Sequence, residues 1–211
     1  MAVSEGRKPL VLVLHGPSGV GKESVIEGLQ KALGIHRATS TTDREPRDGE
    51  RDGVDYHFVS TARFEQMIKA GAFAEYARVY EDWKGLERSE IERPLRRGQD
   101  VIIRTDVNGV RHWRRTLEGA VTVVIIAAGH KTPAEYHKTI TRARIVNREP
   151  HISLAKLQTR LDEVDDELAD ADNNDYVVVN HHNGLDSAIA ELLAIVAYER
   201  ANVSRISPRL V

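Results

Sequence analysis

The chain has 211 residues, a length that fits one domain, and 41% of them are hydrophobic, which is enough for a sizeable core. Its 30 basic and 32 acidic residues give a formal net charge of −2, which argues against a general nucleic-acid binder, because such proteins carry a strong basic excess. The absence of cysteine excludes disulfides, cysteine-based metal sites and a cysteine nucleophile. No apolar run reaches the roughly 20 residues of a membrane-spanning helix, and the polar start has no signal-peptide core, so we expect a soluble cytoplasmic protein.

The first part of the chain has the pattern that opens an α/β fold. Residues 9–15 form a continuous apolar run, which is typical of a strand buried on both faces of a parallel sheet. A glycine-rich turn follows, and apolar residues at helical spacing predict a helix over residues 22–33. Strand, glycine turn and helix in this order favour an α/β protein.

The rest of the chain alternates short apolar runs with helical patterns. Residues 40–54 contain almost nothing apolar, and we expect a long functional loop there. Strands are predicted at residues 56–59, 73–80, 100–103, 121–126 and 176–179. Helices are predicted at residues 61–70, 89–97 (interrupted by Pro94), 107–117, 134–146, 153–169 and 185–201. Residues 1–7 and 202–211 are expected to fray.

A phosphate-binding loop is the strongest local pattern. The segment Gly-Pro-Ser-Gly-Val-Gly-Lys at residues 16–22 follows a predicted strand and opens a predicted helix, the context that a P-loop requires. Backbone N–H groups and the helix N-terminus would surround phosphate oxygens, and Lys22 would reach the terminal phosphates. The predicted nucleotide-phosphate site consists of Gly16, Pro17, Ser18, Gly19, Val20, Gly21, Lys22, Glu23 and Ser24.

Glu23 stands where the P-loop pattern has a Ser or Thr that binds Mg²⁺. Two interpretations stay open. The carboxylate is a good hard ligand and could hold Mg²⁺ directly or through water. Alternatively, Glu23 is only a favourable acid in the first turn of a helix.

A second anion site is predicted in the polar loop. Arg44 and Arg47 flank Pro46, which stiffens the chain. Arginine forks pair bidentately with phosphate, so the two side chains could clamp a phosphate dianion. A solvated charged loop is the alternative.

With these residues, the sequence resembles the guanylate kinase family over residues 9–200. The resemblance rests on the P-loop at 16–22, S-x-x-x-R-x-P-R-x-G-E-x-x-G-x-D-Y at 40–56, F-A-E-Y-A at 73–77, Gly85, D-V-N-G at 106–109, R-L at 160–161 and D-Y-V-V-V-N at 175–180. It implies one α/β domain over residues 1–211, a three-layer P-loop kinase with a central parallel sheet. The implied parts are a core (8–40, 92–129 and 153–201), a GMP-binding insert (41–91) and a mobile lid (130–152).

The resemblance implies Mg²⁺-dependent transfer of the γ-phosphoryl group of ATP to GMP, giving ADP and GDP in purine nucleotide metabolism. From the charge balance and the lack of a long apolar run we expect no nucleic-acid or membrane partner, and we expect a monomer or a homodimer. The catalytic residues implied by the resemblance are Lys22, Arg144, Arg148 and Arg160, with Arg142 as a competing candidate in the lid. Its implied GMP-binding residues are Ser40, Arg44, Arg47, Glu50, Tyr56, Glu75, Lys84 and Asp106.

Glu75 has a chemical reason to select guanine. One carboxylate can accept hydrogen bonds from both N1–H and N2–H₂ of guanine, a pair of donors that adenine lacks, and sites built on such pairing reject the wrong analogue strongly. From the residue pattern alone, a surface strand position for Glu75 and a solvated helix face for the lid arginines remain alternatives.

The sequence departs from the family pattern at several positions. Besides Glu23, Lys84 replaces a tyrosine that contacts the GMP phosphate, and Leu86 replaces a Ser or Thr. Arg104 stands in place of an acid two residues before Asp106, and Asp43 replaces a threonine in the polar loop. These changes leave the fold and phosphate binding in place and bear on the identity of the acceptor.

Two other functions are compatible with parts of the pattern. The first is a related P-loop kinase with another phosphorylated acceptor, such as a ribose bisphosphate, because such kinases also carry an acid after the P-loop lysine. The second is a non-catalytic guanylate-kinase-like binding module, although such modules typically lose the P-loop that this chain keeps.

Asn180 follows the predicted strand over residues 176–179 and has two interpretations. Its side chain could border the adenine of ATP, or it could cap the end of the strand.

Overall fold

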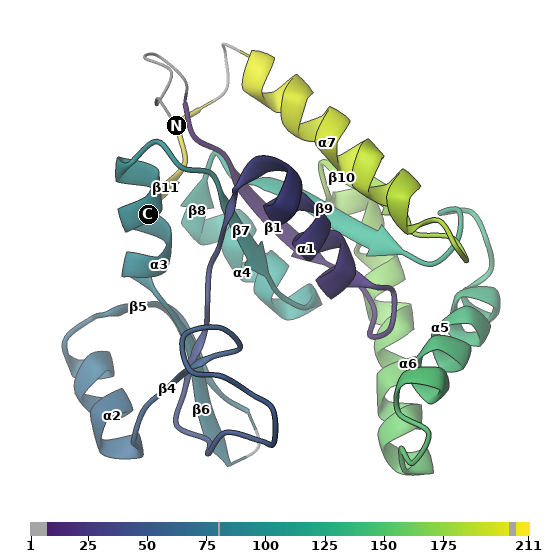
Figure 1. Cartoon of the computed structure of the whole chain (residues 1–211), viewed down its shortest axis with the longest axis horizontal. Helices are drawn as coiled ribbons and strands as arrows, with labels where there is room; N and C mark the ends of the chain where they lie inside the picture. The colour runs from purple at the N-terminus through teal and green to yellow at the C-terminus, as the bar shows by residue number, and fades with distance from the viewer. Residues whose placement is uncertain (1–7, 80, 203–205) are drawn as a thin grey trace.

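A computed structural model describes residues 8–79, 81–202 and 206–211, and the centre of the molecule is a five-stranded sheet (Figure 1). The strands lie in the order β10-β9-β1-β7-β2, and every neighbouring pair is parallel. Their bounds are β1 (Val11–His15), β2 (His36–Arg37), β7 (Val101–Arg104), β9 (Val121–Ile126) and β10 (Tyr176–Val179). The expected parallel sheet is therefore confirmed, and all carboxyl ends of these strands meet at one edge.

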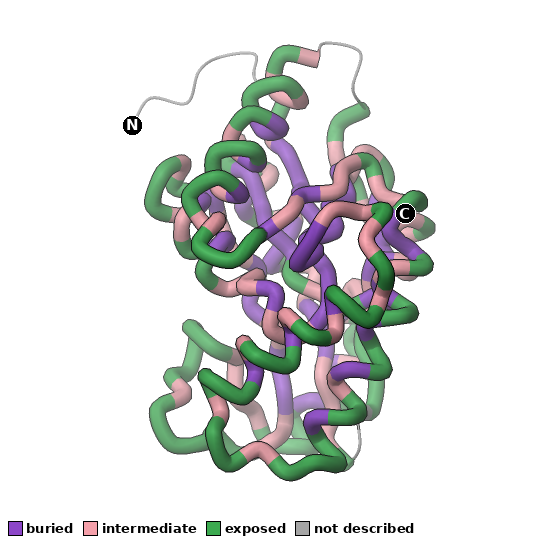
Figure 2. The backbone as a smooth tube through the Cα atoms, turned by 90° about the vertical axis from the view of Figure 1, so that its right-hand side faces the viewer, coloured by how far each residue is buried: buried purple, intermediate pink, exposed green. Residues whose placement is uncertain are grey.

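Helices cover both faces of this sheet because alternate residues of each strand point to opposite sides. Leu12 and Leu14 of β1 pack with α1 (Lys22–Leu33) and α7 (Leu185–Ala201). Val11 and Val13 of the same strand face the other layer. That layer contains α3 (Arg88–Arg96) and α4 (Val107–Thr116), whose Trp113 is fully buried. Figure 2 shows the buried positions along the central strands and the exposed ones on outer helical turns. Burial on both faces explains why the strands read as continuous apolar runs.

Residues 41–87 build a second, smaller lobe below the central sheet (Figure 1). Its four strands lie in the order β4-β3-β6-β5. Their bounds are β3 (Thr41–Thr42), β4 (His57–Phe58), β5 (Phe73–Val79) and β6 (Asp82–Glu87), and the helix of the lobe is α2 (Thr61–Lys69). Phe64 of α2 stacks on Phe73 of β5, with ring centroids 4.4 Å apart, and Met67 completes this separate small core.

Helices α5 (Ala134–Arg148) and α6 (Leu154–Ala169) pack against each other at the other side of the molecule (Figure 1). Ile145 of α5 meets Leu157 and Leu161 of α6 in a cluster of buried apolar side chains. A short 3₁₀ turn, η1 (Ala171–Asn173), then leads into β10. None of the helices in the described part of the chain combines the length and the apolar character that crossing a bilayer requires.

The sequence patterns missed several short strands. These are β2, β6 and β3, the last inside the segment expected to be a long loop, and also β8 (Leu117–Glu118) and β11 (Arg209–Leu210), which pair with each other antiparallel. The expectation that all of residues 202–211 fray was therefore wrong, because β11 is fixed by its ladder to β8. The other end, residues 1–7, lies outside the described residues, as does Tyr80 at the end of the predicted strand over residues 73–80.

Pro94 does not interrupt α3, contrary to expectation. The helix runs from Arg88 to Arg96 with Pro94 buried in its last turn. A proline so close to the C-terminal end removes a single hydrogen bond while its ring fills space in the core, so the helix tolerates it.

The sheet core supplies a stability prediction. Replacing the fully buried Leu12 by alanine should lower the free energy of unfolding by about 2–5 kcal/mol, because it removes apolar contacts and leaves a cavity. Leu154, the first residue of α6, is 82% exposed and provides the matched control, for which Leu154→Ala should change stability by less than about 0.5 kcal/mol. Urea unfolding measures both, and equal losses would contradict the assignment of β1 to the core.

Candidate active site

The chain turns sharply where β1 ends. Gly16 and Gly21 have φ angles of +139° and +91°, values that favour glycine. A Cβ atom on Gly16 would lie 2.1 Å from the carbonyl oxygen of Ile125, so any side chain there would collide with β9. Helix α1 begins at Lys22, directly after this turn. The local sequence thus folds into a narrow loop that ends at a helix N-terminus, an arrangement that attracts anions.

Lys22 bends back over this loop. Its ammonium group donates hydrogen bonds to the carbonyl oxygens of Gly16 and Pro17, the latter at 2.9 Å. Burial lowers the pKa of Lys22 to about 8, an effect opposed by the negative charge of Glu167 and increased by Arg104. Since burial disfavours the ammonium ion, an anion bound beside it would stabilise its charge.

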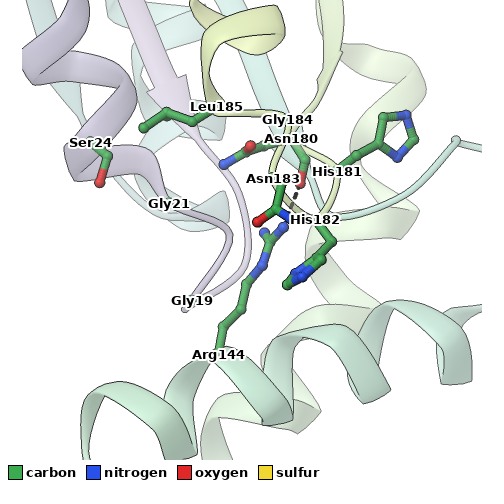
Figure 3. Close-up of a pocket in the computed structure, with 10 residues that line it drawn as sticks. All are labelled: Gly19, Gly21, Ser24, Arg144, Asn180, His181, His182, Asn183, Gly184 and Leu185. Carbon is green, nitrogen blue, oxygen red and sulfur yellow. Dashed lines mark hydrogen bonds between the residues drawn. The ribbon is translucent and has the colours of Figure 1, made fainter.

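A cavity of about 290 Å³ adjoins the loop (Figure 3). Arg144 extends into it from α5, and its guanidinium group donates to the carbonyl oxygens of Asn180 (2.8 Å) and Val20 (3.3 Å). The side-chain amide of Asn180 also donates to Val20, at 2.7 Å. The loop, α5 and the end of β10 are thus tied together. The lining residues are Gly19, Gly21, Ser24, Arg144, Asn180, His181, His182, Asn183, Gly184 and Leu185.

The segment 181–185 was missed as a pocket wall. It follows β10 directly, and the carboxyl ends of parallel strands are where ligands bind in α/β sheets. Its position after a predicted buried strand was therefore the available signal.

The other two arginines of the predicted catalytic set meet at one carboxylate. Arg148 and Arg160 both donate to Oε1 of Glu149, at 2.6 and 2.8 Å. These two guanidinium groups hold the pKa of Glu149 at about 2, the Arg160 hydrogen bond having the largest effect. Arg142, the competing candidate, is exposed on α5.

Residues of the polar loop form a second cationic cluster in the small lobe. Arg44 makes a bidentate pair with Glu50, at 2.8 and 2.9 Å. The backbone N–H of Arg47 also donates to Glu50, at 2.8 Å, and this hydrogen bond and then that from Arg44 lower the pKa of Glu50. The Tyr56 ring centroid lies 5.7 Å from the guanidinium carbon of Arg44 and 5.7 Å from the ammonium nitrogen of Lys84. The Arg47 side chain is exposed beside this cluster.

Two carboxylates, one from each lobe, lie close enough to influence each other. Burial raises the pKa of Glu75, on β5, to about 7, and the negative charge of Asp106 raises it further. Asp106 caps α4 by accepting a hydrogen bond from the backbone N–H of Gly109 at 2.8 Å. Ser40 immediately precedes β3 and is partly buried, and its carbonyl oxygen accepts from the N–H of His57 at 2.9 Å.

Glu23 is surrounded by arginines. One carboxylate oxygen pairs with Arg37 at 2.8 Å, and the other pairs with Arg104. Both oxygens are thus engaged by cations, an arrangement that does not fit a magnesium ion held by Glu23. Among the described residues, no three His, Asp or Glu side chains are grouped as a metal site.

The sequence model for guanylate kinase matches residues 6–199, which is most of the chain and spans both lobes. The chain belongs to the guanylate kinase family. The family match therefore includes the P-loop, the polar loop and the α5–α6 pair in one continuous alignment.

Individual family members support the assignment. The chain is 34% identical to guanylate kinase 2, chloroplastic/mitochondrial, of Oryza sativa over 94% of its own length and 67% of that protein. It is 31% identical to the guanylate kinase of Chromohalobacter salexigens, covering 98% of this chain and 91% of that one. A crystal structure of guanylate kinase from Anaplasma phagocytophilum has the same fold, with a TM-score of 0.67 and 22% identity over 94% of this chain and 90% of that chain.

Glu75 makes the stability of the protein depend on pH. Its pKa rises from an ordinary 4.5 to about 7 on folding, so the folded state binds this proton more tightly than the unfolded state. The contribution of Glu75 therefore lowers the free energy of unfolding as pH rises from about 4.5 to about 7. Urea unfolding across this range should show the stability of Glu75→Gln increasing relative to that of the original chain as the pH rises. The exposed Glu65→Gln serves as control, and parallel curves for Glu75→Gln and the original chain would contradict the assigned pKa.

Proposed function

We propose that this chain transfers the γ-phosphoryl group of ATP to GMP and releases ADP and GDP. The observation that carries the proposal is a pair of anion sites, the P-loop and the Arg44 cluster, with the partly buried Glu75 on β5. A member of the guanylate kinase family with these two sites has a place for each phosphorylated substrate.

The donor nucleotide would occupy the P-loop and the adjoining cavity. Backbone N–H groups of residues 18–21 and the start of α1 would bind its phosphates. A phosphate oxygen would replace the two loop carbonyls as partner of Lys22. The cavity beside Asn180 would hold the nucleoside, with Arg144 at the phosphate side.

The acceptor would lie in the small lobe. Arg44 and Arg47 would bind the phosphate of GMP, assisted by Tyr56 and Lys84, while Glu50 holds Arg44 in place. An ionised Glu75 would accept both donors of guanine. The remaining contacts to the base are assigned to Ser40 and Asp106.

The transfer step needs alignment and positive charge rather than a nucleophilic side chain. Lys22, Arg144, Arg148 and Arg160 would supply this charge. Arg148 and Arg160 are paired with Glu149, so movement of the lid (130–152) over the substrates would exchange that carboxylate for phosphate. Closure would also exclude water from the migrating group.

Magnesium would accompany ATP. A magnesium ion in kinases is bound by substrate phosphates, water and one or two protein oxygens, and the paired oxygens of Glu23 do not offer such a ligand. We extend the proposal to a cytoplasmic location, to small nucleotides as the substrates, without nucleic-acid or membrane partners, and to a monomer or homodimer.

The acceptor should be guanine-specific. With ATP and Mg²⁺ in a coupled assay, GMP should exceed AMP in kcat/KM by about 10⁴-fold, and UMP and ribose bisphosphates should also be poor acceptors. A better acceptor than GMP would favour the related P-loop kinase, and binding of nucleotides without turnover would favour a non-catalytic module.

Lys22→Met should lower kcat by about 10³-fold, because the side chain acts on phosphate. The unfolding curve of this variant should stay unchanged.

Glu75 should control GMP use through its charge. Because guanine binding needs the ionised carboxylate, kcat/KM for GMP should rise with pH and level off above about 7. Glu75→Gln should lower kcat/KM for GMP by about 100-fold, abolish this inflection, and leave the KM for ATP unchanged. Unchanged GMP turnover in Glu75→Gln would remove the base-reading role, and Glu65→Gln is again the matched control.

A further inference from the structure

Two departures from the family pattern, Glu23 and Arg104, touch each other. Arg104 ends β7 and lies in register with Leu14 of β1, the strand that runs into the P-loop. Asp106 follows two residues later at the start of α4. Arg104 therefore stands at the carboxyl edge of the sheet, where the P-loop and the start of α4 also lie.

The carboxylate of Glu23 pairs with a second arginine besides Arg104. Arg37 on β2 pairs with the other oxygen of the same carboxylate, at 2.8 Å, and lies in register with Ile102 of β7. The cluster of Glu23, Arg37 and Arg104 combines three separate elements and carries one positive charge in excess. The Arg104 side chain is the more exposed of the two arginines, at 39% against 24% for Arg37.

The cluster also acts on the P-loop lysine. The positive charge of Arg104 lowers the pKa of Lys22, and the negative charge of Glu23 raises it. The Arg104 and Lys22 cations therefore lie close enough to repel each other. Glu167 and Glu23 oppose this repulsion, but burial keeps the pKa of Lys22 lowered, and a nucleotide phosphate would add further negative charge there.

A role in stability alone explains the cluster poorly. Glu23 and Arg104 are 42% and 39% exposed, and ion pairs this open to water contribute little to folding. A guanidinium group carries five N–H donors, and the pair with Glu23 engages nitrogen Nη1, so donors remain for a phosphate oxygen.

We propose, resting on the proposed function, that Arg104 is a further catalytic residue that binds the phosphoryl group as it passes between the two nucleotides. Glu23 is its positioning residue and not a ligand of magnesium. The contact consists of hydrogen bonds from the guanidinium group to phosphoryl oxygens, so no covalent bond to the protein forms. The acid that follows the P-loop lysine thereby serves to place a cation at the site of transfer.

Kinetics of the full chain test this pair. Arg104→Met should lower kcat by about 100-fold, because it removes a donor that stabilises charge in the transition state. The KM values for ATP and GMP should change by less than about threefold, the pattern of an interaction made mainly in the transition state. Glu23→Gln should lower kcat by about tenfold through misplacement of Arg104, and Arg104→Lys should recover part of the lost rate.

A double-mutant cycle separates positioning from independent action. If Glu23 acts through Arg104, the double variant Glu23→Gln/Arg104→Met should be as slow as Arg104→Met alone, within about twofold. The matched control pair is Glu118 and Arg209, an exposed ion pair at 2.6 Å between β8 and β11. Glu118→Gln and Arg209→Met should leave kcat unchanged, and unfolding curves establish that every variant folds.

Binding measurements without turnover complete the test. A bisubstrate probe, adenosine and guanosine joined by five phosphates, is titrated by calorimetry in EDTA. Arg104→Met and Glu23→Gln should both weaken its binding there, although no metal is present. The Mg²⁺ concentration for half-maximal activity should be the same in Glu23→Gln as in the original chain.

The outcomes distinguish the two proposals. Absence of GMP phosphorylation by the original chain would overturn the proposed function. An active chain in which Arg104→Met is equally fast, or in which the effects of the two variants multiply, would overturn this inference alone. A raised Mg²⁺ requirement in Glu23→Gln would identify Glu23 as a metal ligand and also overturn it.

Discussion

The tight turn after β1 is the constraint on which the site depends. The backbone at Gly16 packs so closely against the carbonyl oxygen of Ile125 on β9 that a side chain at this position of the loop would not fit. The position of that loop follows from β1, whose side chains are buried on both faces between two helical layers. Packing of the strand thus determines where the phosphate loop and the start of α1 lie, and Lys22, Glu23 and Arg144 are arranged around them.

The cations of the site are held by groups of the protein itself. Lys22 donates hydrogen bonds to loop carbonyls, and Arg44 pairs with Glu50. Arg148 and Arg160 both donate to Glu149, and Arg104 pairs with Glu23. These pairs keep the guanidinium and ammonium groups ordered near the places where phosphates are proposed to bind. In the proposed function, substrate binding would exchange an internal acceptor for a phosphate oxygen, to which these cations donate charge-assisted hydrogen bonds.

Charge at the site is balanced across elements that are far apart in the sequence. Glu23 places a negative charge where the pattern has a neutral Ser or Thr, and Arg104 places a positive charge where the family pattern has an acid; in the fold the two are partners. Glu75 and Asp106 show the opposite case, since burial and then the negative charge of Asp106 raise the pKa of Glu75. The site therefore contains one cluster with excess positive charge beside the P-loop and one acidic pair contributed by both lobes, each beside a different proposed substrate.

Sequence patterns predicted the long elements well. The buried strands, α1 and the helices over residues 134–201 carry enough apolar residues for their periods to be recognised. Strands of two residues, such as β2 and β11, contain no period and exist only through a ladder to a distant partner. The mixed sequence of β6 shows no alternation, although it pairs with both β3 and β5.

The chain by itself determined the phosphate loop, the layered α/β architecture and the family, because these depend on local residue order and on buried apolar runs. Tertiary structure decided which charges meet. Strand order and helix packing bring Glu23 next to Arg104 and allow Arg148 and Arg160 to share the carboxylate of Glu149. They also place residues 181–185 as a wall of the cavity beside the P-loop. Electrostatic attraction acts through space, so the partner of a charged residue is set by the folded chain and not by its sequence neighbours.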